Sequence, residues 1–239
     1  PIKMINYTIS YTKPHRHFID FKLSTKVNGA EKMQFQLPAW RPGRYELGNF
    51  SQNIQKWKAV NSHGSNLTFR KITKDLWEVD TLGESEITIY YNFYANQLDA
   101  GACYLDEHQL YLNPVHCMFY IVDRIEDEYL IDIDLPHDYE IACSMQVKNH
   151  HISVKGYDEL AESPIICSDT LQCNSYVVNG INFYIWFQGE CIIDWDRLRK
   201  DFVKFTKSQI EKFDGFPADQ YHFLFQITPY KSYHGVEHT

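Results

Sequence analysis

The sequence predicts a mostly β protein with one helix near its C-terminal end. Three observations carry this prediction. Apolar and polar residues alternate along several short segments, which is the pattern of half-buried strands. The dipeptide Asn-Gly occurs twice, and it favours tight turns because both residues tolerate positive φ. Only the stretch that begins near residue 194 repeats apolar residues at helical spacing.

Strands dominate the N-terminal half of the sequence. Apolar residues at odd positions alternate with mostly polar residues at even positions in 19–23, 33–37, 87–93 and 131–135. A hairpin turn is expected at Asn28-Gly29, between the first two of these segments. In the last segment the outward positions are Asp132 and Asp134, which we interpret as a solvated strand face and not as a metal site.

Residues 37–50 have the most unusual composition in the chain. Two prolines and two glycines oppose regular strand pairing, while three aromatic side chains give the segment enough apolar area to pack down. We therefore expect an ordered loop. Two roles stay open for it: it covers a sheet edge, or it brings Arg41 and Arg44 to a cleft.

An acidic, turn-prone segment at 156–164 divides the chain. We place a domain boundary there, which gives one domain at 1–160 and a second at 161–239. In the second, Asn179-Gly180 is expected to form a hairpin turn before a strand at 181–187.

The one expected helix follows that strand. Asp194 can cap its first turn, and Gly215 with Pro217 ends it. Its apolar stripe consists of Trp195, Leu198, Phe202, Phe205, Ile210 and Phe213. A further strand is expected at 221–227, before the C-terminal tail.

Charge and cysteine content limit the class of protein. A formal net charge of −8 and the absence of a basic run exclude nucleic acid and anionic membranes as main partners. No apolar stretch approaches the roughly 20 residues that a membrane helix needs. The six cysteines show no C-x-x-C pair, which favours reduced, buried thiols and a cytoplasmic location, with a periplasmic or secreted one left open.

The C-terminal tail combines a glycine, a carboxylate and two imidazoles. Gly235 would let a ligand backbone approach closely, and Glu237 would offer a negative charge to a free amine if the tail runs extended beside a cleft. The same residues, 234–238, also spell H-x-x-E-H, an inverted zinc motif that requires a helix. A frayed chain end is the third interpretation.

Three motifs in order along the chain, Leu37–Tyr45, Leu160–Ile165 and Gly235–His238, resemble the glycyl aminopeptidase family of zinc peptidases. The resemblance implies an N-terminal antiparallel β-sandwich followed by the β-rich start, strands plus one helix, of a thermolysin-like α+β catalytic domain. It also implies that Gly235, Val236, Glu237 and His238 lie on an edge strand and bind the N-terminus of a peptide substrate, Glu237 holding the α-amino group. Family members usually have a second glycine where this chain has His234.

The zinc motif H-E-x-x-H of such enzymes does not occur in this sequence. We therefore expect no catalytic residue and no metal ligand in this chain, with zinc held by residues beyond Thr239 in the intact enzyme. The resemblance makes the chain the inactive N-terminal part of an aminopeptidase for small first residues, Gly or Ala. Its partners would be the rest of the catalytic domain and, in many members, a PDZ domain. The alternatives are a non-catalytic β-sandwich binding or scaffold module and the inverted zinc site.

Overall fold

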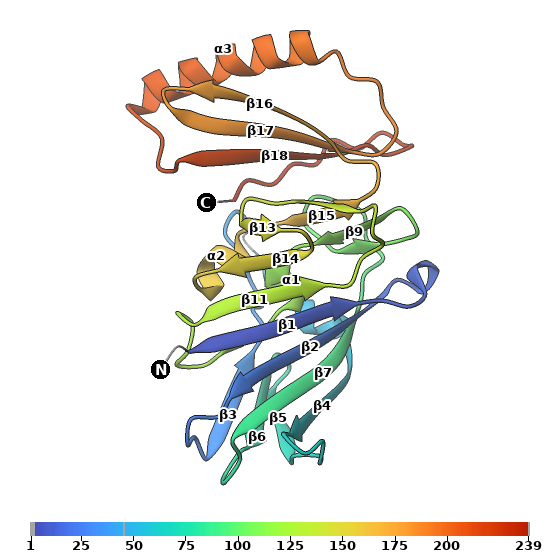
Figure 1. Cartoon of the computed structure of the whole chain (residues 1–239), viewed down its shortest axis with the longest axis vertical. Helices are drawn as coiled ribbons and strands as arrows, with labels where there is room; N and C mark the ends of the chain where they lie inside the picture. Colours follow the sequence, from blue (N-terminus) through green and yellow to red (C-terminus); the bar gives the residue numbers. More distant parts are fainter. Residues whose placement is uncertain (1–2, 45, 239) are drawn as a thin grey trace.

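Residues 3–44 and 46–238 are described by a computed structural model of the chain. Figure 1 shows a larger lower part made mainly of strands and a smaller upper part, in which one long helix lies on a three-stranded sheet. The predicted mostly β fold is confirmed. None of the described helices combines the length and apolar character needed to span a bilayer.

The largest sheet of the lower part has seven strands in the order β13-β14-β11-β1-β2-β7-β4. In chain order these are β1 Met4–Ser10, β2 Phe18–Lys26, β4 Ile54–Asn61, β7 Glu86–Tyr94, β11 Glu128–Ile133, β13 Gln146–Lys148 and β14 His151–Val154. All neighbours are antiparallel except β1 and β11, which run parallel. Alternation is strict in β2, where Ile19, Phe21 and Leu23 are buried between exposed polar residues, as predicted.

Two smaller sheets complete the lower part. One has the order β10-β3-β6-β5, with β3 Lys32–Gln36, β5 Phe69–Thr73, β6 Leu76–Asp80 and β10 Tyr120–Ile121. The other has the order β12-β15-β9-β8, with β8 Tyr104–Leu105, β9 Gln109–Leu112, β12 Glu140–Ala142 and β15 Ile165–Ser168. Four short helices connect these strands: η1 Pro14–Arg16, η2 Phe50–Asn53, α1 Pro114–Cys117 and α2 Tyr157–Ala161. Side chains from all three sheets share one apolar core.

The predicted hairpin at Asn28-Gly29 is wrong, although the turn itself forms. Asn28 and Gly29 have φ values of 57° and 79°, as the dipeptide predicts. The flanking strands do not pair with each other: β2 belongs to the seven-stranded sheet and β3 to a four-stranded one. The turn therefore carries the chain from one sheet of the core to another, because tertiary packing decides strand partners.

Buried tyrosine hydroxyls form hydrogen bonds with the backbone between α1 and β10. The Tyr91 hydroxyl donates to the carbonyl of Cys117, and the Tyr7 hydroxyl accepts from the backbone N–H of Phe119, at 2.6 and 2.8 Å. Tyr157 likewise donates to the carbonyl of Met118 at 2.7 Å. This segment lies inside the core, where a backbone N–H or C=O group without a hydrogen bond would destabilise the fold. The tyrosine hydroxyls supply the hydrogen bonds that a neighbouring strand would otherwise make.

The upper part is built on β16 Gln172–Val178, β17 Ile181–Gln188 and β18 Gln220–Gln226. The second predicted hairpin is correct, because β16 and β17 pair across Asn179-Gly180. β17 and β18 run parallel, which requires a crossover, and α3 Trp195–Phe213 supplies it. Asp194 caps α3 as predicted, accepting from the Arg197 N–H at 3.1 Å.

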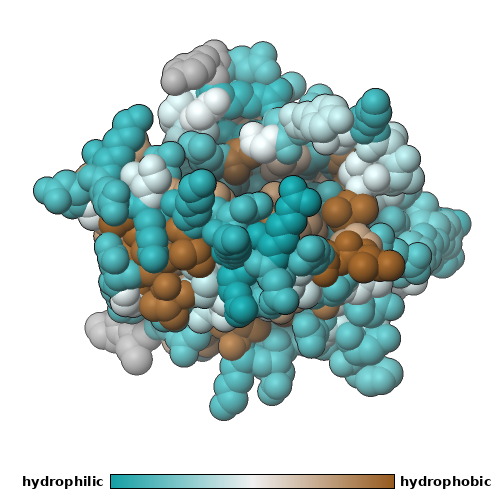
Figure 2. All heavy atoms as spheres, turned by 90° about the horizontal axis from the view of Figure 1, so that it is seen from above, coloured by the Kyte–Doolittle hydropathy of each residue, from teal (hydrophilic) through white to brown (hydrophobic). Residues whose placement is uncertain are grey.

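Only part of the predicted apolar stripe of α3 faces the sheet. Ile210 is buried, and Trp195, Leu198 and Phe202 pack partly buried beside it. Phe205 remains 41% exposed because the next residue, Thr206, takes the buried position of that turn, and Phe213, the last residue of α3, remains 69% exposed. Figure 2, which looks down on the α3 end of the molecule, shows brown apolar patches within a mostly hydrophilic surface.

The other face of this sheet packs on the lower part. Trp186 and Leu224 contact a small cluster formed by Tyr111, Ala142 and Ile166. The first core extends to Cys167, and the second begins with Tyr176. The change from the first apolar core to the second therefore falls between β15 and β16. The domain boundary predicted between residues 160 and 161 lies a few residues earlier and remains a prediction.

Candidate functional site

The three motifs that carry the family resemblance meet at one place. The first is the loop after β3, the second follows α2, and the third is the tail after β18. In Figure 1 the tail runs between the upper sheet and the lower part, and its end lies near the β13 side. The fold thus brings together segments whose separation in the sequence is 70 residues or more.

Both tail histidines face carboxylates of the lower part. His234 Nδ1 lies 3.6 Å from Asp99 Oδ1, and His238 Nδ1 lies 3.5 Å from Glu162 Oε2. The second pair is the more enclosed, with 17% and 19% of the two side chains exposed. Between the histidines, Gly235 and Glu237 are exposed. The tail is thus held at both ends of the proposed substrate-binding residues.

Arg41 lies next to these acids. It is only 6% exposed, and its Nη2 packs directly against Gly101, where a Cβ would clash with it. Burial, followed by repulsion from Arg44, lowers the pKa of Arg41, and attraction to Tyr111, Asp99 and Glu162 opposes that shift. Of the two roles considered for residues 37–50, the approach of arginines to a site is the one that this geometry supports. Tyr45 lies outside the described residues.

A hollow of about 340 Å³ adjoins this cluster. It is lined by His116, which is 7% exposed and stacks on Phe50 with ring centroids 3.9 Å apart. His116 Nε2 is buried without a hydrogen-bond partner among the described residues. Burial, followed by repulsion from Arg41, Arg44 and His238, lowers the pKa of His116 to about 3. This imidazole is therefore neutral at pH 7.

The predicted substrate-binding residues lie together, but in neither of the two predicted backbone forms. No helix or strand includes residues 227–238. The helix required by the inverted zinc motif is therefore not formed, and each imidazole faces a different carboxylate. The extended edge strand is also not formed. The motif lies in irregular backbone, with open space where a Cβ on Gly235 would be.

Sequence reasoning missed three residues of this cluster. Asp99 and His116 carried no usable signal, because their relation to the tail depends on contacts across more than a hundred residues. Glu162 lies inside the second motif, and that membership was a signal that could have assigned it a role at the tail.

The described residues do not fit a zinc ion. Within residues 3–44 and 46–238 no three His, Cys, Asp or Glu side chains stand close enough to hold a metal.

Asp132 is exposed and pairs with His151, which agrees with the interpretation of a solvated strand face.

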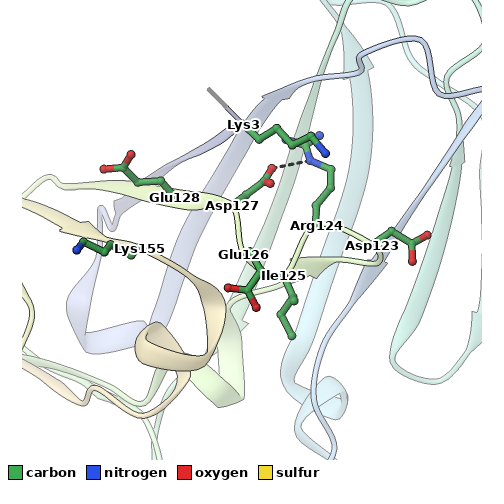
Figure 3. Close-up of a pocket in the computed structure, with 8 residues that line it drawn as sticks. All are labelled: Lys3, Asp123, Arg124, Ile125, Glu126, Asp127, Glu128 and Lys155. Carbon is green, nitrogen blue, oxygen red and sulfur yellow. Dashed lines mark hydrogen bonds and ion pairs between the residues drawn. The ribbon is translucent and has the colours of Figure 1, made fainter. Parts of the chain in front are cut away.

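A second hollow of about 640 Å³ is not part of the candidate site (Figure 3). None of the motif residues lines it. Its central feature is the ion pair between Arg124 and Asp127, at 2.6 Å, and Arg124 also donates to the Lys26 carbonyl at 2.9 Å. Because these polar groups bind one another, we interpret them as structural.

Solved structures of peptidases share this fold. A crystal structure of an aminopeptidase N family protein from Idiomarina loihiensis superposes with a TM-score of 0.86 at 24% identity, covering 94% of this chain and 39% of that one. An M1 zinc metallopeptidase from Deinococcus radiodurans gives a TM-score of 0.53 at 9% identity, covering 97% and 57%. At these identities the likeness shows the fold alone.

Residues 6–169 match the peptidase M61 N-terminal domain, and the chain belongs to this family. No curated protein matches the sequence. The chain spans 39% to 57% of the length of the solved structures named above.

Proposed function

We propose that this chain is the N-terminal part of a zinc-dependent aminopeptidase that removes small first residues, Gly or Ala, from peptides. Family membership and the fold shared with solved peptidases support a peptidase. One of the similar structures, a variant of the Deinococcus radiodurans enzyme, contains a bound Tyr-Ser-Ala substrate. Zinc would be held by residues outside 1–239, since the part of the chain that the structure describes has no fitting ligand set, and a PDZ domain is a further expected neighbour.

The observation that carries the proposal is the exposed position of the Glu237 carboxylate. Its side chain is exposed in a segment held on both sides by ion pairs, beside a glycine that nothing covers. A carboxylate in this position can accept hydrogen bonds from the ammonium group of a peptide's N-terminus. Binding that group at a fixed place would present only the first peptide bond for hydrolysis.

The test is Glu237→Gln in the intact enzyme. We expect kcat/KM for an alanyl peptide to fall about 10- to 100-fold, because a hydrogen bond to a charged group contributes about 1.5–3 kcal/mol. The N-acetylated peptide, which has no ammonium group, should be affected much less.

The matched control is Glu211→Gln, which removes the same charge from an exposed position of α3. It should leave kcat/KM for both peptides unchanged. Equal losses for free and acetylated peptides, or no loss with Glu237→Gln, would remove the assigned role.

A further inference from the structure

The two acids that face the tail histidines share one cationic neighbour, Arg41. Asp99 and Glu162 come from different parts of the lower core, one from the turn between β7 and β8 and the other from the end of α2. Both attract the buried guanidinium of Arg41. Each also faces one histidine of the tail, His234 and His238 respectively. The same two acids therefore interact both with Arg41 and with the segment that contains Glu237.

The acids are fixed independently of the tail. Asp99 Oδ1 accepts the backbone N–H of Gly101 at 2.8 Å, and its other oxygen accepts from Gln97. Glu162 follows directly on α2, whose Leu160 is fully buried, and the next residue, Ser163, donates to the Glu159 carbonyl at 2.6 Å. These contacts lie within the lower part, and they orient the Asp99 carboxylate and hold the backbone at Glu162.

The position of Arg41 depends on the same turn. Its guanidinium packs against the backbone of Gly101, two residues after Asp99, in space that any side chain at 101 would fill. The guanidinium is thus fixed beside the turn that carries Asp99, and it is attracted to both Asp99 and Glu162. In the tail, by contrast, no strand or helix holds the described residues 227–238. The Ile227 N–H bonds the Gln188 carbonyl at 2.9 Å, and the contacts of His234 with Asp99 and of His238 with Glu162 tie the segment that follows to the lower part.

We propose that Arg41, Asp99 and Glu162 are positioning residues that hold residues 234–238 against the N-terminal domain and so determine where Glu237 meets the substrate's amino group. This inference rests on the proposed function. It assigns a role to the first and second family motifs: they orient the third. The lower part is then a component of the substrate-binding site and not only a separate β-sandwich attached to a catalytic domain.

The test compares Glu162→Gln with Glu159→Gln in the intact protein. Both variants lose one carboxylate at or just after α2, but Glu159 is exposed and three residues away. Hydrogen exchange in peptides that cover 230–238 reports on the tail without any need for activity. We expect faster exchange there in Glu162→Gln and no change in Glu159→Gln.

Kinetics supply the second readout. In Glu162→Gln, KM for an alanyl peptide should rise about 3- to 10-fold with kcat nearly unchanged, since an ion pair of this exposure contributes modestly and the reacting groups are intact. Glu162→Asp keeps the charge and should recover part of the loss.

The outcomes separate this inference from the proposed function. If exchange in 230–238 is the same in Glu162→Gln and Glu159→Gln, the positioning role is overturned, whatever Glu237→Gln does. If exchange rises but KM stays at the wild-type value while Glu237→Gln weakens binding of the free amine, the positioning role is again overturned. If Glu237→Gln itself has no effect, the proposed function fails, and faster exchange would still show that Glu162 holds the tail.

Discussion

Replacing His116 by phenylalanine is expected to make the protein more resistant to acid. His116 is buried with its Nε2 unpartnered among the described residues, and burial lowers its pKa from 6.5 to about 3. Its ring stacks on Phe50 beside a hollow of about 340 Å³, which leaves room for the slightly larger ring. At pH 7 the variant should therefore lie within about 1 kcal/mol of the wild type, because removing an unpaired buried polar atom costs little.

The expected size follows from proton linkage. The folded-state pKa of His116 lies below the unfolded-state value, so between pH 6.5 and 3 the unfolded chain binds one more proton at this residue. Stability is therefore lost as pH falls through this range, at about 1.4 kcal/mol per pH unit for one proton. From pH 6.5 to 4.5 His116 should account for about 2 to 3 kcal/mol, and the variant should not show that loss.

Urea unfolding followed by tryptophan fluorescence at pH 7, 5.5 and 4.5 measures this contribution. His222, whose pKa burial lowers to about 4, is present in both proteins and cancels in the comparison. His63→Phe, at an exposed position, is the matched control and should keep the wild-type slope. The reasoning would be refuted if the free energy of unfolding of His116→Phe fell as steeply with decreasing pH as that of the wild type.

Two other predictions concern the core. Gly101→Ala should lower the free energy of unfolding by about 1–3 kcal/mol, because the new methyl group clashes with buried Arg41. Gly235→Ala is the control: nothing lies within 4 Å of the new methyl group, so the same urea titration should show little change. In a thiol titration of the native protein only Cys173 and Cys191 should react, and Cys173 slowly, because burial raises its pKa to about 11. The four buried cysteines should react only after unfolding, and rapid modification of all six in the native state would contradict the described packing.

The fold was predictable where local pattern and tertiary structure agree. The alternation in 19–23 became the buried and exposed faces of β2, and the Asp194 cap and the Asn179-Gly180 hairpin formed as expected. The turn at Asn28-Gly29 shows the limit of this reasoning. Its two positive φ values follow from the dipeptide, but which sheet each flanking strand joins depends on long-range packing that a tight turn does not encode.

The candidate site was predictable in its tail and not in its surroundings. Gly235 and Glu237 stand out in the sequence because their chemistry is local. The roles of Asp99 and Glu162 could not be derived, since a carboxylate in a turn is usually solvated, and only the fold shows that each one faces a tail histidine. The tail backbone was also predicted as a strand, yet the described residues after Gln226 join no sheet.

The buried arginine explains why the first motif combines prolines, glycines and aromatic residues. A guanidinium that is 6% exposed requires a rigid setting, because a mobile loop would let it return to water. The N–H of Gly48 closes the loop on the Ala39 carbonyl at 2.6 Å, and Phe50, which stacks on His116, fixes its end. The loop thus holds Arg41 where it is attracted to Asp99 and Glu162, the two acids that face the tail histidines. A substitution that loosens this loop should therefore disturb the tail before it unfolds the β-sandwich.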